Sequence, residues 1–536
     1  MGKAAFVLLI LLIGLPALAV AEPAPAEAEF AELVRQLDAD SFAHKGQAVD
    51  RIARSGHPRA VEILETMLAG NLQTLREDGR IVVVNQVGRD FEITDALSGD
   101  DLGTVGRRDL SRIGINNALR TQIRAALARA SLNDPDPATR LAAVRRLMAN
   151  PDLENLTLLR NRLAEETEPR IQAAIEVAMA LSRLEDDDPA VRLAAIDHLD
   201  GNLQSQVRNR LRTVSTDDPD AEVRSAAAEA LDNIQRRLEY YRFLENVFFG
   251  LSLGSVLLLA AIGLAITFGV MGVINMAHGE LIMIGAYTTY MIQQLFPGAI
   301  EYSVLIAIPA AFIVAGLFGI AIERGVIRFL YGRPLETLLA TFGISLILQQ
   351  LVRTTISAQN VPVISPSWMS GSWQINDALA ITWNRLYILI FAILVFISLL
   401  VALKHTRLGL KMRAVTQNRS MAQAMGVRTA WVDALTFGLG AGIAGVAGVA
   451  LSQLTNVGPN LGQGYIIDSF LVVVFGGVGN LWGTLVGAFS LGILNKFIEP
   501  WSGAVLAKIL VLVFVILFIQ RYPRGLFPQK GRAAGG

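Results

Sequence analysis

The second half of this 536-residue chain contains a series of apolar segments of about the length that crosses a lipid bilayer. A helix needs about 20 apolar residues to span the roughly 30 Å hydrocarbon core. Nine such segments can be read, of which the seventh is short, so we expect eight to ten spans. They lie near 247–269, 278–296, 303–323, 335–352, 386–403, 430–452, 465–479, 481–498 and 505–520. Because backbone groups in lipid must be satisfied internally, such a sequence predicts a bundle of membrane-spanning helices.

Charge separates the two halves of the chain. Residues 22–246 hold 39 acidic and 29 basic side chains, whereas 247–536 hold 8 and 17. Over the whole chain 18% of residues are charged, below the roughly 25% of soluble domains, and the formal net charge is zero. These values argue against an ordinary cytosolic enzyme and against a nucleic-acid-binding protein. The absence of cysteine excludes disulfides and thiolate metal sites.

The first 21 residues have the order of a secretory signal peptide. Lys3 precedes an apolar run over 4–15, and small residues follow. The alternative is an uncleaved anchor helix, but this run is too short to cross a bilayer. We therefore predict cleavage after Ala19 or Ala21, which places the domain that follows outside the cytoplasm.

Residues 22–240 are rich in Ala, Leu, Arg and Asp with helical spacing. A pattern of Asp and Pro, then Arg, then two alanines begins at 134, 186 and 217, with a weaker copy at Pro169. Asp caps a helix N-terminus, Pro fits its first turn, and alanines allow neighbouring helices to approach closely. We interpret the domain as a short α-solenoid resembling HEAT repeats, with an irregular helical bundle as the alternative.

One segment of this domain has strand character. The residues 81–85 and 91–94, bounded by glycines, predict a small β-hairpin. The predicted fold class is therefore all-α, with a polytopic helical membrane domain of eight to ten spans preceded by a periplasmic HEAT-like solenoid that carries one hairpin. The expected domains are a signal peptide (1–21), the helical domain (22–240), the membrane domain (247–523) and a cytoplasmic tail (524–536).

The loop charges predict the same topology by an independent route. If the first span runs inward, the loops after spans three, five and nine are cytoplasmic, and these loops hold most of the basic residues. They are Arg324, Arg328, Arg333, Lys404, Arg407, Lys411, Arg413, Arg419, Arg428, Arg521, Arg524, Lys530 and Arg532. The predicted outer loops carry only Arg353 and Arg385, close to span ends. We expect the N-terminus outside and the C-terminus inside.

The loop between spans five and six is long and cationic. Residues 404–432 contain six Lys or Arg and no Asp or Glu, and their helical spacing ends at Gly426. A loop of this length with its own helix indicates a docking surface for a partner. The alternative is an inner loop held on anionic lipid by its positive charge.

Two glycine-rich junctions indicate a translocation path. Phe268–Glu280 and Phe475–Gly483 both contain Phe-Gly, a second Gly three residues later and a nearby Asn. Irregular backbone at membrane depth is tolerated only where protein or water surrounds it. The candidate solute-path residues are Asn275, His278, Glu280, Asp468 and Asn480. The alternative places His278 and Glu280 at the inner interface and makes Asp468 and Asp433 helix caps.

Two catalytic patterns can be set aside. Residues 250–254 match G-x-S-x-G, but they open an apolar span, where small residues permit close helix contact. The sequence contains no G-x-x-x-x-G-K-[ST], so a Walker loop for ATP is absent from this chain. The sequence therefore predicts neither a catalytic site nor a bound cofactor or metal here.

Several segments together resemble the permeases of branched-chain amino acid ABC transporters. They are Ile274–Glu280, Met283–Tyr287, Ala424–Val427, Phe475–Gly487 and Arg521–Phe527. The resemblance covers about 247–527. Within that family, an exported leader followed by a HEAT-like extension looks like the urea ABC transporter permease subunit.

The resemblance implies a subunit of an ATP-driven importer for urea or short amides in the bacterial inner membrane. The implied partners are a second permease, two cytoplasmic ATPase subunits that hold ATP and Mg²⁺, and a periplasmic solute-binding protein. By similarity, Arg413, Gln423 and Gly426 belong to the segment that couples to the ATPases. Many importer permeases carry Glu-Ala-Ala there, whereas this chain has Ala422-Gln423-Ala424 and lacks the acid.

Three alternatives to this function stay open on the residues alone. The solute could be a branched-chain amino acid, because few ionisable groups in the spans suit a zwitterion as well as a neutral amide. The chain could also be an ATP-independent channel or secondary carrier. A third reading is an envelope scaffold whose solenoid is the working part.

Overall fold

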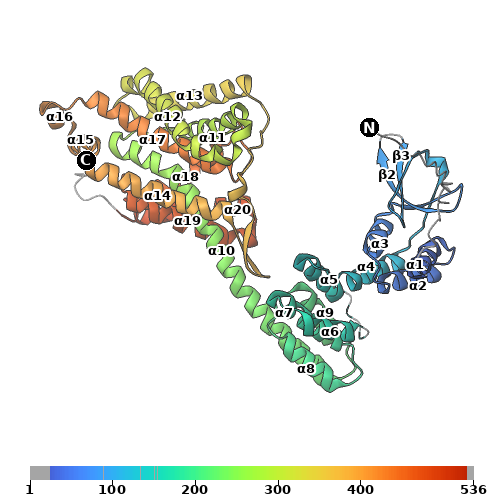
Figure 1. The fold of residues 1–536 in the computed structure, drawn as a ribbon. Helices are drawn as coiled ribbons and strands as arrows, with labels where there is room; N and C mark the ends of the chain where they lie inside the picture. Colours follow the sequence, from blue (N-terminus) through green and yellow to red (C-terminus); the bar gives the residue numbers. More distant parts are fainter. Residues whose placement is uncertain are drawn as a thin grey trace, which may run out of the picture. The chain divides into compact units, whose positions relative to one another are not determined.

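The computed structural model describes residues 25–527 except 88–89, 133, 150, 152 and 154. The chain divides into two compact units, one up to Arg236 and one from Arg237 onward (Figure 1). The predicted signal peptide and most of the predicted cytoplasmic tail lie outside the described residues.

The first part of the N-terminal unit combines helices with a β-sheet. Its elements are α1 (Pro25–Arg35), η1 (Gln36–Asp38), α2 (Phe42–Arg54), α3 (Ala60–Ala69), β1 (Leu72–Leu75), β2 (Ile81–Val87), β3 (Asp90–Asp95), β4 (Asp101–Val105), η2 (Arg107–Asp109), β5 (Leu110–Arg112) and α4 (Asn117–Ser131). The five strands are antiparallel in the order β4-β3-β2-β1-β5. Val82, Val84 and Ile93 form a small core on this sheet.

The predicted hairpin is confirmed as β2–β3, in which Val84 is paired with Ile93. The prediction of one hairpin alone is wrong, because three further strands extend it. Strands β1, β4 and β5 have only three to five residues, and β4 is largely exposed. Segments this short show no apolar alternation that distinguishes them from loops.

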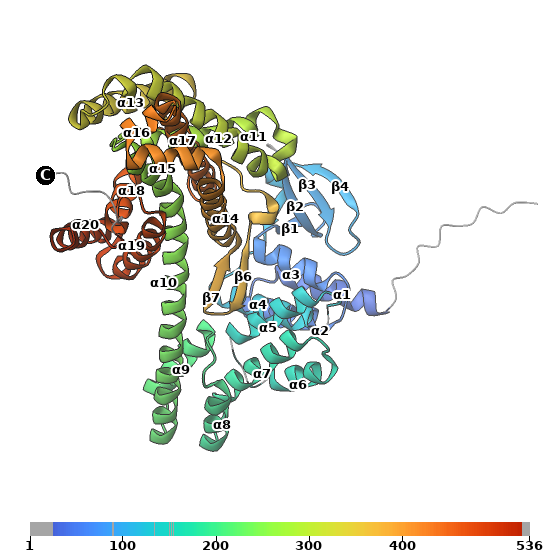
Figure 2. The same ribbon diagram turned by 90° about the vertical axis from the view of Figure 1, so that its left-hand side faces the viewer.

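The second part of the N-terminal unit is a stack of helices (Figure 2). It consists of α5 (Pro137–Ala149), α6 (Asn155–Glu165), α7 (Pro169–Arg183), α8 (Pro189–Leu199), α9 (Ser205–Asp217) and the start of α10 (Ala221–Met271). Two predicted caps are present: Asp136 accepts from Ala138 N, and Asp188 accepts from Ala190 N. In the third repeat the cap is Asp220, which follows Pro219 and accepts from Glu222 N. These caps fix where the helices begin.

The membrane unit consists almost entirely of helices. After α10 come α11 (His278–Leu295), η3 (Pro297–Ala299), α12 (Ile300–Gly325), η4 (Ile327–Phe329), α13 (Pro334–Thr355), η5 (Ser367–Met369), β6 (Ser372–Asn376), β7 (Leu379–Thr382), α14 (Trp383–His405), α15 (Arg407–Gln417), α16 (Arg419–Ala424), α17 (Thr429–Ser452), α18 (Gln463–Gly476), α19 (Leu481–Ser502) and α20 (Ala504–Arg521). Each of the nine predicted spans coincides with a helix. The small β6–β7 pair was not predicted.

Seven helices in the described part of the chain are long and apolar enough to cross a bilayer. They are α10, α12, α13, α14, α17, α19 and α20. The other two predicted spans are α11 and α18. With 14 residues, α18 is about 21 Å long and shorter than the roughly 30 Å hydrocarbon core.

Glycines bring α17 into close contact with its neighbours. A Cβ at Gly448 would lie 1.9 Å from the carbonyl oxygen of Ile282, and one at Gly440 would lie 2.7 Å from that of Gly263. Helices α11, α12 and α17 therefore pack tightly together (Figure 2). Both α11 and α17 are buried over most of their length, so polar groups on α11 are enclosed by protein.

Candidate solute path and coupling segment

A buried polar cluster lies where α11 begins. Glu280 is 2% exposed, and its Oε1 accepts a hydrogen bond of 2.6 Å from Gln349 Nε2 of α13. On the same helix α13, Thr341 Oγ1 accepts from Met276 N at 3.1 Å, and Ser345 Oγ lies 3.4 Å from Gln349 Nε2. The structure thus joins the Asn275–Glu280 junction to α13 through hydrogen bonds.

Three side chains near this junction have unused hydrogen-bonding atoms. Asn275 accepts from Ala277 N at 3.0 Å, but its Nδ2 has no partner. His278 is fully buried, and its Nε2 lies 2.8 Å from Ala260 O, so Nε2 carries the proton and Nδ1 remains an unpartnered acceptor. Tyr287, two turns along α11, has a buried hydroxyl with no partner. Buried polar atoms without a partner are uncommon in folded proteins, and three of them lie on this junction and on α11.

The α13 side of the cluster was missed from the sequence. Thr337, Thr341, Ser345 and Gln349 recur every fourth residue and are at most 5% exposed, whereas Leu335 and Leu339 of the same helix are more than 70% exposed. This helix therefore turns polar groups inward and apolar groups outward. The recurrence of a polar residue at every fourth position was the sequence signal that could have identified this buried face of α13.

Asp468 and Asn480 do not share the hydrogen bonds of this cluster. Asp468 lies within α18, where its Oδ2 pairs with Lys508 Nζ at 3.1 Å. It is therefore not a helix cap. Asn480 caps α19 by accepting from Trp482 N and Gly483 N, and its Nδ2 donates to Phe527 O at 3.3 Å.

The two glycine-rich junctions identified in the sequence meet in space. A Cβ at Gly269 would lie 2.6 Å from the Cα of Gly479, so their backbones are in direct contact. Both glycines line a cleft of about 870 Å³. Its walls include Asn480 and, from the cationic loop, Arg413. A predicted solute-path residue and a predicted coupling residue therefore face the same cleft.

The cationic loop forms two helices with defined ends. Arg413 of α15 donates to Leu403 O at the end of α14. Gln423 of α16 donates to Thr429 Oγ1 at 3.3 Å. Gly426 follows α16 with a positive φ of 84°, and a Cβ placed there would meet open space. The glycine ends the helix where the sequence predicts.

An ion pair ties this loop to the membrane helices. Arg419 of α16 donates through both terminal nitrogens to Asp433 of α17, whose side chain is 4% exposed. Its guanidinium also donates to Tyr331 Oη at 2.8 Å and lies 4.1 Å from the centre of that ring. Burial opposes the charge, but the bonds to Asp433 and Tyr331 raise the pKa of Arg419. The sequence offered a helix cap as the alternative for Asp433, but Asp433 lies inside α17, and the sequence placed Arg419 only in a basic loop.

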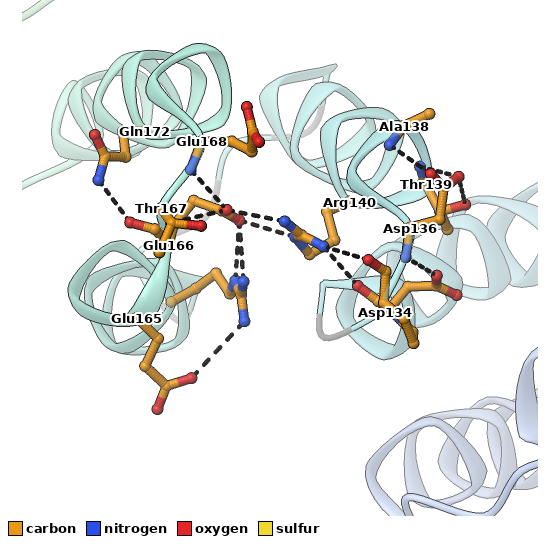
Figure 3. A network of polar contacts seen from close by, with 12 residues as sticks. Asp134, Asp136, Ala138, Thr139, Arg140, Glu165, Glu166, Thr167, Glu168 and Gln172 are labelled. Carbon is orange, nitrogen blue, oxygen red and sulfur yellow. Dashed lines mark hydrogen bonds and ion pairs between the residues drawn. The ribbon is translucent and has the colours of Figure 1, made fainter.

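The N-terminal unit contains a different polar network, in which one arginine joins two helices (Figure 3). Arg140 Nε and Nη2 each donate to Glu166 at 2.9 Å, and Nη1 donates to the carbonyls of Asp134 and Pro135. Arg162 also donates to Glu166. The same arrangement recurs 52 residues later, where Arg192 bonds the carbonyls of Asp186 and Asp187 and pairs with Asp218.

The family of the membrane unit follows from sequence comparison. A family model described as branched-chain amino acid transport system / permease component matches residues 246–519 of the 536. The chain belongs to this family. It is a multi-pass membrane transport subunit and not an enzyme. A HEAT-repeat model matches residues 177–245, which supports the HEAT-like interpretation for the last part of the predicted 22–240 domain.

Individual relatives match the same part of this permease. The high-affinity branched-chain amino acid transport system permease protein LivH of Salmonella typhimurium is 32% identical over 298 residues, covering 54% of this chain and 96% of LivH. The corresponding protein BraD of Pseudomonas aeruginosa is 30% identical over 297 residues, with the same coverage. The ribose import permease protein RbsC of Escherichia coli is 27% identical over 284 residues, covering 51% of this chain and 84% of RbsC. No solved structure matches significantly.

Proposed function

We propose that this permease is the membrane subunit of an ATP-driven importer of branched-chain amino acids. Together with a second permease it forms the solute path, two ATPase subunits bind and hydrolyse ATP with Mg²⁺, and a periplasmic protein delivers the solute. The observation that supports this most directly is the likeness to LivH and BraD, which extends over nearly the whole of those proteins.

The substrate proposal departs from the sequence-based expectation of urea. That expectation depended on the leader and on the HEAT-like extension, and both lie outside residues 246–519, which the permease family model matches. The relatives are named for branched-chain amino acids, and a carboxylate such as Glu280 bonds an ammonium ion more strongly than it bonds the neutral N–H groups of urea. Urea and short amides are therefore the second candidate.

The buried cluster at α11 gives the path its chemistry. Asn275 Nδ2 and Tyr287 Oη are donors without partners, and Glu280 carries acceptor capacity beyond its bond to Gln349. We propose that a solute passing between the two permeases hydrogen-bonds to these groups when α11 and α13 move apart. His278, held by Ala260 O, orients the junction.

The α15–α16 segment connects the solute path to the ATPase subunits. We propose that it seats in an ATPase subunit and that movement passes through Arg419 to Asp433 on α17 and Tyr331 after α12. Helices α12 and α17 both pack against α11. The motion thereby reaches the polar cluster without long flexible elements.

We further propose the orientation predicted from the loops. The N-terminal unit lies in the periplasm of a bacterial inner membrane protein, and α15, α16 and the C-terminus lie in the cytoplasm. The solenoid contacts the solute-binding protein or the second permease.

The test is uptake by the reconstituted importer. Proteoliposomes holding both permeases and the ATPases, supplied with the binding protein, are expected to accumulate labelled leucine, isoleucine and valine. This accumulation requires ATP on the side of the membrane where the ATPase subunits lie. Urea and acetamide are expected to stay at background. Accumulation of urea instead would overturn the substrate assignment.

The same vesicles separate an importer from a channel or secondary carrier. An ATPase subunit that binds but does not hydrolyse ATP is the control. Uptake that persists with this control, or without any ATPase, contradicts the ATP-driven mechanism.

A further inference from the structure

A small cavity with charged walls lies between α10, α18, α19 and α20. Its volume is about 190 Å³. Asp468 of α18, Lys496 and Glu499 of α19 and Lys508 of α20 line it, together with apolar side chains that include Leu257 and Leu491. The volume is below the roughly 300–1,000 Å³ of pockets for drug-sized ligands and suits a small solute.

The four charges form two ion pairs. Lys508 Nζ lies 3.1 Å from Asp468 Oδ2, and Lys496 Nζ lies 2.6 Å from Glu499 Oε2. The side chains are between 23% and 54% exposed. Because exposed pairs are weak, a solute with its own charges can exchange with them at little cost. The two acids and two bases have no net charge together, and a zwitterion also has none. Its binding therefore leaves the cavity without an unbalanced charge.

We propose that this cavity binds a zwitterionic amino acid with an apolar side chain. The solute ammonium bonds to Asp468 or Glu499, its carboxylate bonds to Lys508 or Lys496, and its side chain packs on the leucines. A neutral amide offers no ion to either pair, so it cannot replace the bonds that it breaks. This inference depends on the proposed function and adds to it a second binding site besides the α11 cluster.

A purely structural role for the pairs makes a different prediction. If Lys508 and Asp468 serve only to join α20 to α18, replacing both by neutral side chains of similar shape is tolerated, because neither charge is left alone. If they bind a zwitterion, the same double replacement removes both recognition groups.

The experiment measures leucine binding to the assembled importer in lipid nanodiscs, without nucleotide or binding protein. Labelled leucine is expected to bind saturably to the wild type. The double variant D468N/K508M is expected to weaken that affinity by roughly tenfold or more, as loss of charge-assisted hydrogen bonds does. Leucinamide lacks the carboxylate, and 4-methylpentanoate lacks the ammonium group. Each is expected to displace labelled leucine from the wild type with an affinity that is lower than that of leucine by a similar factor.

A matched control and a second variant guard the result. Arg333, directly before α13, and Glu336, in its first turn, form an exposed pair, and R333Q/E336Q is expected to leave leucine binding unchanged. Should D468N/K508M fail to assemble, K496M/E499Q tests the other pair.

Two failures are distinguishable. If the wild type imports leucine but the variants that assemble bind it as tightly as the wild type, or if the wild type shows no saturable binding, the cavity proposal is overturned while the proposed function stands. If the wild type imports no branched-chain amino acid, the proposed function fails and the cavity proposal fails with it.

Discussion

Two buried polar clusters, one in each unit, differ in how completely their hydrogen-bonding atoms are satisfied. In the N-terminal unit, Arg140 and Glu166 bond each other twice, and Arg140 also bonds two carbonyls. In the membrane unit, Asn275, His278 and Tyr287 each retain an atom without a partner. A saturated network stabilises one conformation, whereas unused donors and acceptors are available to a passing molecule. On this contrast we propose that the first cluster stabilises its unit and that the second contacts the solute.

The largest expected effect is on local opening of the cluster formed by Arg140, Arg162 and Glu166, which we call the saturated cluster. Glu166→Gln leaves Arg140 without its charged partner and leaves Arg162 with only its longer pair to Glu165, in a site where the Glu166 side chain is fully buried. Because the chain has no cysteine, a thiol placed at buried Ala178 of α7 reports local opening. Thiol labelling is expected to accelerate about 100-fold, the factor typical of breaking a buried pair.

The control for Glu166 is an exposed pair of the same unit. Asp232 and Arg236 are both about two-thirds exposed, and Asp232→Asn is expected to leave labelling at Ala178→Cys unchanged. If Glu166→Gln also leaves the labelling rate unchanged, the saturated cluster does not stabilise the stack.

The second effect concerns the unsaturated cluster. Glu280→Gln keeps an acceptor for Gln349 but removes the charge offered to a solute ammonium. Leucine uptake by the reconstituted importer is expected to fall roughly 10–100-fold, whereas membrane insertion and the yield of assembled complex stay at wild-type levels.

The matched control for Glu280 is Thr436→Val. Thr436 is equally buried, but its hydroxyl donates to Val432 O of its own helix and has no role toward a solute. Unchanged uptake is expected. Equal loss of uptake in both variants means that burial of a polar group, and not solute contact, explains the Glu280 result.

A smaller effect is expected at the connection between the coupling loop and the membrane helices. The double variant R419Q/D433N retains hydrogen-bonding groups but removes the ion pair between α16 and α17. Leucine transported per ATP hydrolysed is expected to fall roughly fivefold, the lower range of coupling energies between sites. The exposed Arg407, changed to Gln, is the control. A proportional fall in both transport and hydrolysis contradicts a coupling role.

The smallest effect depends on pH. Hydrogen bonds from Arg140 outweigh burial and lower the pKa of Glu166 from 4.5 to about 2. Its stabilising contribution is therefore complete above about pH 4.5 and is lost as the pH falls through 2. Cleavage of the α5–α7 region by pepsin is expected to differ between wild type and Glu166→Gln at pH 4.5, with the difference narrowing toward pH 2. A constant difference over that range contradicts the assignment.

The sequence was sufficient for the main elements because each had a strong local signal. Apolar segments predicted nine helices of the membrane unit, although α10 begins at Ala221, well before the predicted start at 247, and Asp136 and Asp188 cap helices as their spacing indicated. The glycine junctions also proved informative, since Gly269 and Gly479 touch. In each case the physical cause lies within one turn of helix or one stretch of backbone.

What the sequence did not predict depends on pairing between distant segments. Strands β1, β4 and β5 are recognisable only beside β2 and β3. Gln349 bonds Glu280 although the two are 69 residues apart in the sequence. Asp468 forms an ion pair with Lys508 and takes no part in the hydrogen bonds of the α11 cluster. A list of candidate side chains cannot show which of them share a site, because that depends on how helices pack.

One helix, α10, has a consequence for dissecting this protein. It runs without interruption from Ala221 to Met271, so that a repeat helix and the first span are a single element. Its early residues Val223, Ala227, Ala230 and Ile234 are all buried. A soluble fragment that stops before Ala221 lacks these apolar groups and exposes whatever they cover, whereas one that continues toward Gly250 acquires lipid-facing surface. A usable boundary therefore falls inside the helix, a few residues after Ile234.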